Sequence, residues 1–396
     1  MDHAGTLLEF KKEFSSREGI QFNNAGRSPL STSAAERLAT MAFLSQTQAS
    51  LLDMEWIASL GEVRKSVADF LGAGIDEVAF TPNCATALSQ AALGFPLRAG
   101  DEVITIDQEY ASNYYPWKVS CERSGGKFTV IHSGDPSGPA SSDFFSGEAL
   151  TKKVLAAIRP GVKIVALSWV QFQTGAVLDL RAIGEKAHSV GAFFVVDGIQ
   201  GIGQLPFSFR DLPVDFIAGG SHKWMCGPLM QGFFAVKREL LAVLQPTIVG
   251  CGTFNRFGTF ADPTAEMELS ARKFEAGGFS LMILSSFNET VRVHAQVGMG
   301  VVADEIARLS GILRRGLLEL AGPGGGKRLE LVTPLDQASG ITSFKLPLDA
   351  EVRFLQRCKE EQIALAKRGD FVRASVHAYC SDDDVTRFLA VLQSAL

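Results

Sequence analysis

Val195-Val196-Asp197-Gly198-Ile199-Gln200, followed downstream by Gly219-Gly220-Ser221-His222-Lys223-Trp224, is the part of the sequence that decides the predicted fold. In each stretch a short apolar run leads to a turn that carries one ionisable residue, Asp197 in the first and Lys223 in the second. Short apolar runs bounded by turn residues are typical of buried parallel strands. We therefore expect two neighbouring strands that end side by side. In open α/β sheets this edge is where ligands bind.

The composition fits a protein with a large buried core. The 396 residues are 46% hydrophobic and 20% charged, and this length suggests two or three domains. The net charge of -5 and the lack of a basic block argue against a nucleic-acid partner. The N-terminus lacks the apolar core of a signal peptide, and no apolar run approaches the roughly 18 residues of a membrane span. Six cysteines without a CxxC pair or zinc spacing predict free thiols, no metal site and a cytoplasmic location.

Strands alternate with helical segments along most of the chain, which predicts an α/β fold with a mostly parallel sheet covered by helices on both faces. The seven expected strands are 78–81, 103–106, 128–131, 163–170, 193–196, 216–218 and 232–236. They belong to a predicted large domain, 23–258. Residues 1–22, with a helix over 1–19, form an N-terminal segment that packs on the small domain. Residues 259–396 form that smaller α+β domain, with helices over 281–302 and 305–320.

Lys223 and Asp197 are the strongest candidates for chemistry. A lysine at the end of a buried strand can form a Schiff base, and an aspartate there can keep a ring nitrogen protonated. Each also has an ordinary interpretation, Lys223 as a solvated loop residue and Asp197 as a helix N-cap. Gln200 either reaches a ligand or faces solvent. The lysine and the aspartate together favour a site for pyridoxal phosphate.

The turn at residues 82–86 separates a predicted strand from a predicted helix and contains Cys84, Ala85 and Thr86. The free N–H groups and the dipole of a helix N-terminus favour a phosphate, and small residues let the anion approach. The alternative is a capped helix that binds nothing, which this turn alone would favour.

Tyr110 and Arg373 complete the candidates. Tyr110 follows a predicted strand, where its ring would stack on a flat ligand, although a lone aromatic residue is more often part of a core. Arg373 is a charge in an otherwise apolar strand, and its guanidinium group suits a carboxylate. A structural salt bridge is an equally good interpretation of Arg373.

Taken together, these residues resemble the class V aminotransferase and cysteine desulfurase-like superfamily of fold-type-I pyridoxal phosphate enzymes. The resemblance runs from Phe22 to the C-terminus, nearly the whole chain. Its most specific part is residues 196–200 with 220–224 and Gly227-Pro228; the other matching segments are 22–26, 109–117, 272–277 and 371–379.

The resemblance implies a role for each matching residue. Lys223 would be the Schiff-base lysine that moves a proton at the substrate α-carbon, and Asp197 would pair with the pyridinium nitrogen. Arg373 would bind the substrate α-carboxylate, assisted by the backbone near Asn24. The other implied cofactor contacts are Cys84, Ala85, Thr86, Tyr110, Gln200, Ser221, His222 and Gly278. The resemblance also implies a homodimer with sites at the interface, in which Gly278 reaches the phosphate of the neighbouring subunit.

Several positions depart from the family pattern. Tyr110 stands where many members have histidine, and Phe172 where desulfurases have asparagine. Ala85 lacks the usual hydroxyl, and Gly278 replaces a common threonine. Residues 364–370, just before Arg373, contain no cysteine, although a persulfide-forming desulfurase needs a thiol there. We therefore do not expect a desulfurase.

The sequence thus predicts a pyridoxal phosphate enzyme that forms an α-carbanion on an amino acid. A class V aminotransferase is the first expectation. A C–S or β-lyase and an epimerase share its first steps and stay open as alternatives. A non-catalytic cofactor-binding protein is the alternative from another class, and the joint presence of Lys223, Asp197 and Arg373 argues against it.

Overall fold

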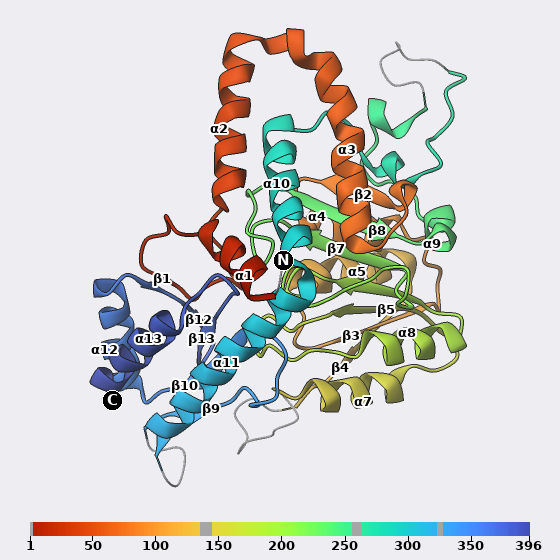
Figure 1. The fold of residues 1–396 in the computed structure, drawn as a ribbon. Helices are drawn as coiled ribbons and strands as arrows, with labels where there is room; N and C mark the ends of the chain where they lie inside the picture. Colours follow the sequence, from red (N-terminus) through yellow and green to blue (C-terminus); the bar gives the residue numbers. More distant parts are fainter. Residues whose placement is uncertain (1–2, 135–144, 256–262, 323–327) are drawn as a thin grey trace.

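The computed structural model describes residues 3–134, 145–255, 263–322 and 328–396. A seven-stranded sheet lies beside a smaller sheet from the C-terminal part of the chain (Figure 1). The strands of the large sheet are β2 (Val78–Thr81), β3 (Glu102–Ile106), β4 (Lys127–Ile131), β5 (Val162–Ser168), β6 (Phe193–Asp197), β7 (Phe216–Gly220) and β8 (Gly232–Val236). Their order is β2-β8-β7-β6-β5-β3-β4, and β8 runs antiparallel to both of its neighbours. The predicted mostly parallel sheet is confirmed.

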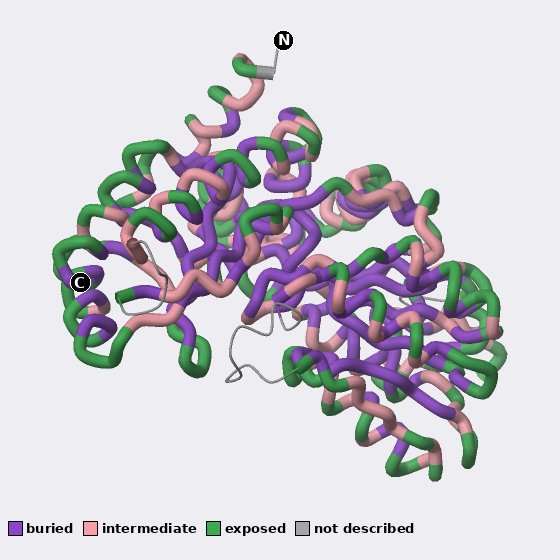
Figure 2. The backbone as a smooth tube through the Cα atoms, turned by 90° about the horizontal axis from the view of Figure 1, so that it is seen from below, coloured by how far each residue is buried: buried purple, intermediate pink, exposed green. Residues whose placement is uncertain are grey.

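Helices cover both faces of this sheet. They are α4 (Cys84–Gly94) and α5 (Ala111–Ser124) on one face, and α7 (Gly147–Ala157) and α8 (Leu180–Ser189) on the other. Successive residues of β5 point to opposite faces, so that Ile164 joins the apolar cluster of α4 and Val165 joins that of α8. The central strands, which helices cover on both sides, are largely buried, and buried backbone runs through the centre of Figure 2.

Further helices surround the large sheet and its connection to the C-terminal part. They are α2 (Thr32–Thr47), α3 (Asp53–Leu71), α9 (Arg238–Val243), α10 (Leu281–Val297) and α11 (Met299–Ala321), with short 3-10 turns η1 (Ala49–Leu52), η2 (Ile75–Glu77), η3 (Cys251–Thr253) and η4 (Ala271–Phe274). α10 packs against both α2 and α3 (Figure 1). The predicted helix over 281–302 is wrong at its C-terminal end, because the chain breaks at Gly298, whose φ of 84° is outside the helical range.

The C-terminal part contains a four-stranded sheet of order β12-β13-β10-β9. Its elements are β9 (Glu330–Leu331), β10 (Ile341–Lys345), β12 (Ala366–Arg368) and β13 (Phe371–Ser375), with α12 (Leu348–Glu360) and α13 (Asp382–Ala395). A separate parallel pair joins β1 (Ile20–Gln21) to β11 (Ile363–Ala364). The start of the chain therefore lies against its C-terminal part. The predicted boundary between residues 258 and 259 lies outside the described residues.

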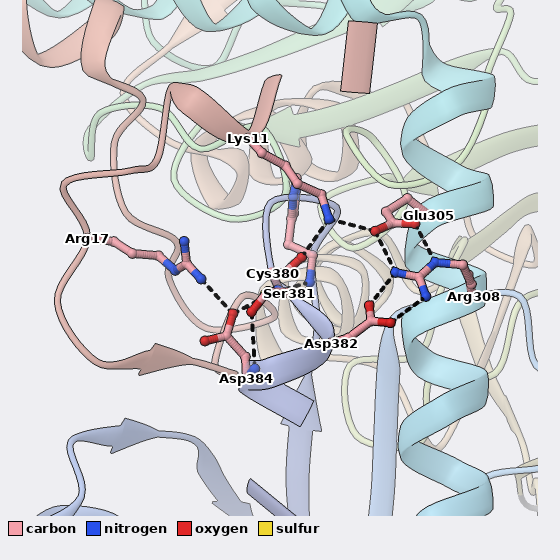
Figure 3. A network of polar contacts seen from close by, with 9 residues as sticks. Lys11, Arg17, Glu305, Arg308, Cys380, Ser381, Asp382 and Asp384 are labelled. Atoms are coloured by element: carbon pink, nitrogen blue, oxygen red, sulfur yellow. Dashed lines mark hydrogen bonds and ion pairs between the residues drawn. The ribbon is translucent and has the colours of Figure 1, made fainter. Parts of the chain in front are cut away.

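The N-terminal helix is shorter than predicted. α1 covers His3–Lys12 rather than residues 1–19, and Phe14 is buried although it lies beyond the helix. Lys11 Nζ lies 2.7 Å from Glu305 Oε1 of α11 and 3.0 Å from the Cys380 carbonyl oxygen, and Arg17 pairs with Asp384 at 2.5 Å (Figure 3). These contacts hold the N-terminal segment against α11 and the start of α13. Within the described ranges we find no helix with the length and apolarity that a membrane crossing requires.

Candidate active site

The carboxyl ends of β6 and β7 meet at a cavity of about 260 Å³. The two strands are parallel neighbours, as predicted. Asp197 is the last residue of β6, and Lys223 lies three residues beyond the end of β7. Both side chains line the cavity. The structure therefore brings together the two groups that the sequence singled out.

A tight turn fixes the backbone around Lys223. The Cys226 N–H donates to the Lys223 carbonyl at 3.0 Å, and the Gly227 N–H donates to the Ser221 carbonyl at 2.8 Å. Cys226 has a φ of 54°, a left-handed conformation that is uncommon for a residue with a side chain. The Trp224 indole donates to Gln200 Oε1 at 2.7 Å. The lysine thus projects from a segment that is held on both sides.

Burial dominates the electrostatics of the cavity. It lowers the pKa of Lys223 to about 8, with Arg373 and Arg368 lowering it further and Asp197 opposing them. Burial also raises the pKa of Asp197, against the N–H of Ile199 and the charge of Lys223. The pKa of His222 falls to about 4, again mainly through burial, so that this imidazole is neutral at physiological pH.

The N-terminus of α4 forms another wall of the cavity. Asn83 caps the helix, and its Oδ1 accepts the Thr86 N–H at 2.8 Å. The first N–H groups of a helix have no partner within the helix. Since the cap takes the N–H of Thr86, those of Cys84 and Ala85 are the ones that an anion would bind, and both residues line the cavity.

Arg373 is buried, with 1% of its surface exposed, and has no acidic partner within ion-pair distance among the described residues. Its guanidinium donates to the Phe172 carbonyl at 2.5 Å and to Asn23 Oδ1 at 3.4 Å, while Nε has no partner. Burial and the charge of Arg368 lower its pKa to about 9. The part of the chain that the structure describes thus offers no salt bridge to support the structural interpretation of Arg373.

Aromatic residues form the outer wall. The rings of Tyr110 and Phe172 meet edge to face with centroids 5.2 Å apart, and Lys223 Nζ lies 5.7 Å from the centre of the Tyr110 ring. Behind Tyr110, Glu109 accepts hydrogen bonds from Ser168 Oγ at 2.6 Å and from its backbone N–H at 2.5 Å. Burial raises the pKa of Glu109 to about 7. This buried network fixes the segment from which Tyr110 projects.

The cavity contains most of the predicted site residues. Those that line it are Cys84, Ala85, Tyr110, Asp197, Gln200, His222, Lys223 and Arg373. Gln200 Nε2 donates to the Ala25 carbonyl at 2.9 Å, which leaves its second N–H for a ligand. Four predicted residues, Asn24, Thr86, Ser221 and Gly278, do not line it.

Three of those four are engaged elsewhere. The Asn24 amide donates to the carbonyls of Gln21 and Ser375, and the Ser221 hydroxyl donates to the Pro228 carbonyl. Thr86 Oγ1 lies 3.0 Å from Asn83 Oδ1. Gly278 lines a second cavity of about 380 Å³ between α3 and residues 275–279. Its predicted contact with a neighbouring subunit stays a prediction.

The structure adds lining residues to which the sequence assigned no role. They are Ala25, Gly26, Asn83, Ser112, Ile199 and Arg368. Arg368 is the one that brings a charge. The sequence feature that could have revealed Arg368 is its spacing to Arg373 across the Gly369-Asp370 turn. In a hairpin of this register the two arginines lie on one face.

Pyridoxal phosphate fits the residues present. Lys223 offers the amine, Asp197 a buried carboxylate for a ring N–H, and the N-terminus of α4 a phosphate site. The unpartnered Nε of Arg373 is a buried donor aimed at no group of the described chain. Each polar function of the cofactor and of an amino acid carboxylate thus has a matching group.

The sequence also matches a protein-family model and the sequences of known proteins. The family model described as "Aminotransferase class-V" matches residues 33–388. A probable cysteine desulfurase from Pyrococcus abyssi is 30% identical over 347 residues, 84% of this chain and 82% of that protein. Isopenicillin N epimerase from Streptomyces clavuligerus is 26% identical over 390 residues, 95% of this chain and 94% of that protein.

A solved structure has the same fold. It is a mutant of C-DES with glycine covalently linked to its PLP cofactor, and it aligns with a TM-score of 0.85 over 97% of this chain and 98% of that one. At 21% identity this likeness concerns the fold alone. The match of the family model, together with Lys223 and Asp197 in one cavity, leads to one conclusion. The chain belongs to the class V aminotransferase family and is a pyridoxal phosphate enzyme of fold type I.

Proposed function

We propose that this enzyme removes the α-proton of an amino acid with Lys223 as the base and transfers the amino group to an oxo acid. The observation that carries the proposal is one cavity shared by Lys223, Asp197 and Arg373. When bound, pyridoxal phosphate delocalises the charge left at the α-carbon through its protonated ring. Asp197 would accept the hydrogen bond of the ring N–H; its Oδ1 already accepts the Ile199 N–H at 2.9 Å, and the described residues donate no hydrogen bond to its Oδ2.

Lys223 is suited to act as a single base. With a pKa of about 8, roughly a tenth of its amine is uncharged at pH 7. The other lining groups with shifted pKa values are poor candidates, because the pKa of His222 is about 4 and that of Cys84 is raised well above its usual value. One base on one face is enough to move a proton between the substrate α-carbon and the cofactor carbon on the other side of the shared nitrogen, as aminotransfer would require. Arg373 would hold the α-carboxylate, since it lacks any other anionic partner among the described residues.

The hairpin before Arg373 argues against a persulfide mechanism. Gly369 and Asp370 alone join β12 to β13, so this position has no mobile loop with a thiol. Cys84 is the cysteine among the described lining residues, and its thiol lies 3.6 Å from Asp197 Oδ1. Burial raises the pKa of Cys84 well above its usual value, so the thiol is neutral and unsuited as a nucleophile. The desulfurase activity named for some relatives is therefore not proposed here.

Epimerisation is the second candidate. The alignment with isopenicillin N epimerase covers 95% of this chain, against 84% for the desulfurase of Pyrococcus abyssi. Inversion at the α-carbon needs a proton donor on the face opposite the base, and the phenol of Tyr110 is a lining group that could supply it.

Product analysis tests the proposal. The holoenzyme is incubated in D₂O with a panel of amino acids, with and without an oxo-acid acceptor, and the products are separated by chiral chromatography. We expect deuterium at the α-carbon and a new amino acid that forms only when the acceptor is present. If the substrate is racemised in the absence of an acceptor, the enzyme is an epimerase and not an aminotransferase. If sulfide or ammonia is released in the absence of an acceptor, the enzyme catalyses elimination instead.

A further inference from the structure

The hairpin β12–β13 places two arginines on one face. Arg368 pairs with Phe371 and Ala366 pairs with Arg373 in the antiparallel register. Cross-strand partners share a face, and so do residues two apart in a strand, so Arg368 and Arg373 point to the same side. They are diagonal neighbours, a relation in which Cα atoms lie about 7–8 Å apart. Both residues line the cavity that contains Lys223.

Arg368 has no anionic partner within ion-pair distance among the described residues. Its guanidinium donates only to the carbonyl of Lys367, at 3.4 Å, and its side chain is exposed at the cavity mouth. Lys367 lies on the opposite face and is already paired with Glu351 of α12. Lys367 and Arg368 therefore differ in their contacts. Lys367 joins β12 to α12, whereas Arg368 faces the cavity without a counter-ion among the described residues.

The charges of the filled site leave Arg368 unused. Asp197 is the carboxylate among the described lining residues, and it would serve the ring nitrogen of the cofactor. The N-terminus of α4 would serve the phosphate, and Arg373 would serve the substrate α-carboxylate. An additional guanidinium beside Arg373 is then matched only by a further negative group on the substrate. A carboxylate suits it best, because a guanidinium fork binds it with two parallel hydrogen bonds.

We propose that Arg368 binds a side-chain carboxylate of the substrate, so that the enzyme selects acidic amino acids over their neutral amides. The inference rests on the proposed function in one respect, the placement of the α-carboxylate on Arg373. It adds a substrate class, amino acids with two carboxylates, and a residue that determines specificity.

Two experiments on the holoenzyme test this assignment. The first measures the affinity of succinate and glutarate, which carry no amine and cannot react, against their monoamides by the shift of the thermal unfolding midpoint. The second compares aspartate with asparagine, and glutamate with glutamine, by the change in the visible absorption of the bound cofactor. Both use the wild type, Arg368→Gln, Arg368→Lys and the matched control Lys367→Gln, which removes the same charge one residue away on the other face.

We expect the wild type and Lys367→Gln to favour the dicarboxylates by about tenfold or more, the scale of one charge-assisted hydrogen bond. Arg368→Gln should reduce this ratio to near one, and Arg368→Lys should keep part of it. An unchanged ratio in Arg368→Gln, or no preference in the wild type, would overturn the assignment. Failure of the proposed function is a different result: no amino acid alters the visible spectrum, whatever the dicarboxylates do.

Discussion

His377 Nε2 lies 2.9 Å from the carbonyl oxygen of Trp224, the residue that follows Lys223. His294 Nε2 of α10 lies 3.2 Å from the same oxygen, and the Trp224 indole bonds to Gln200. The segment that carries the lysine is thus held by residues far away in the sequence. The position of Lys223 consequently depends on the packing of the C-terminal part against the large sheet.

We predict that His377 makes the protein less stable as the pH falls. Burial lowers the pKa of His377 to about 3, whereas the unfolded chain binds the proton near the usual 6.5. Between these values the unfolded state binds more protons, so the free energy of unfolding falls with falling pH by up to about 1.4 kcal/mol per pH unit. His377→Phe keeps an aromatic ring and removes this titration, so its stability should depend less steeply on pH. Denaturant unfolding of both proteins between pH 7.5 and pH 5 measures the difference, and equal slopes would contradict it.

The buried pair of Arg64 and Glu275 should contribute strongly to stability. The guanidinium contacts both carboxylate oxygens, at 2.6 and 2.8 Å, and the Phe80 N–H donates to Glu275 at 2.9 Å. Breaking such a pair leaves a buried charge, and we expect Glu275→Gln to lower the free energy of unfolding by about 3–5 kcal/mol. The control is Lys65→Gln, which breaks the exposed pair with Asp69 and should cost only about 0.3–0.5 kcal/mol. Similar losses in the two variants would count against this role.

The pH dependence of the rate of cofactor attachment should reflect the pKa of Lys223. Only the uncharged amine attacks an aldehyde, so the rate at which cofactor-free protein forms its coloured adduct should rise through about pH 8 rather than the usual 10.5. Asp197→Asn removes a negative charge that favours the ammonium form, and the midpoint should move to lower pH. Stopped-flow absorbance over a pH series gives both midpoints. A midpoint near 10.5, or an upward shift in the variant, would refute this electrostatic account.

Thiol reagents should leave catalysis intact. Cys251 is the exposed cysteine of the six, and the other five are buried. Alkylation of the native protein should therefore modify Cys251 alone, as peptide mass spectrometry would show, and turnover of amino acids should persist. The Cys251→Ser variant should take up no reagent and have the same activity. Inactivation in parallel with alkylation would point to a catalytic thiol.

The sequence predicted the parts of the site that depend on local pattern. Asp197 and Lys223 each follow an apolar strand, and the edge where such strands end is set by the fold class. Arg368 was missed because residues 366–368 were not predicted as a strand, so its pairing across the Gly369-Asp370 turn was not expected. The backbone near Asn24 was assigned to the substrate, and this stays a prediction; the Asn24 side-chain amide donates to Gln21 and to Ser375, a partner 351 residues away. Contacts across such distances follow from tertiary packing rather than from a motif.

The central claim is that Lys223 carries the cofactor. Reduction of the holoenzyme with borohydride, proteolysis and mass spectrometry of the peptides would locate the stable phosphopyridoxyl group. We predict that it is found on Lys223 and that Lys223→Ala binds the cofactor without a covalent bond. Label on another lysine, or none at all on the reduced protein, would contradict the account.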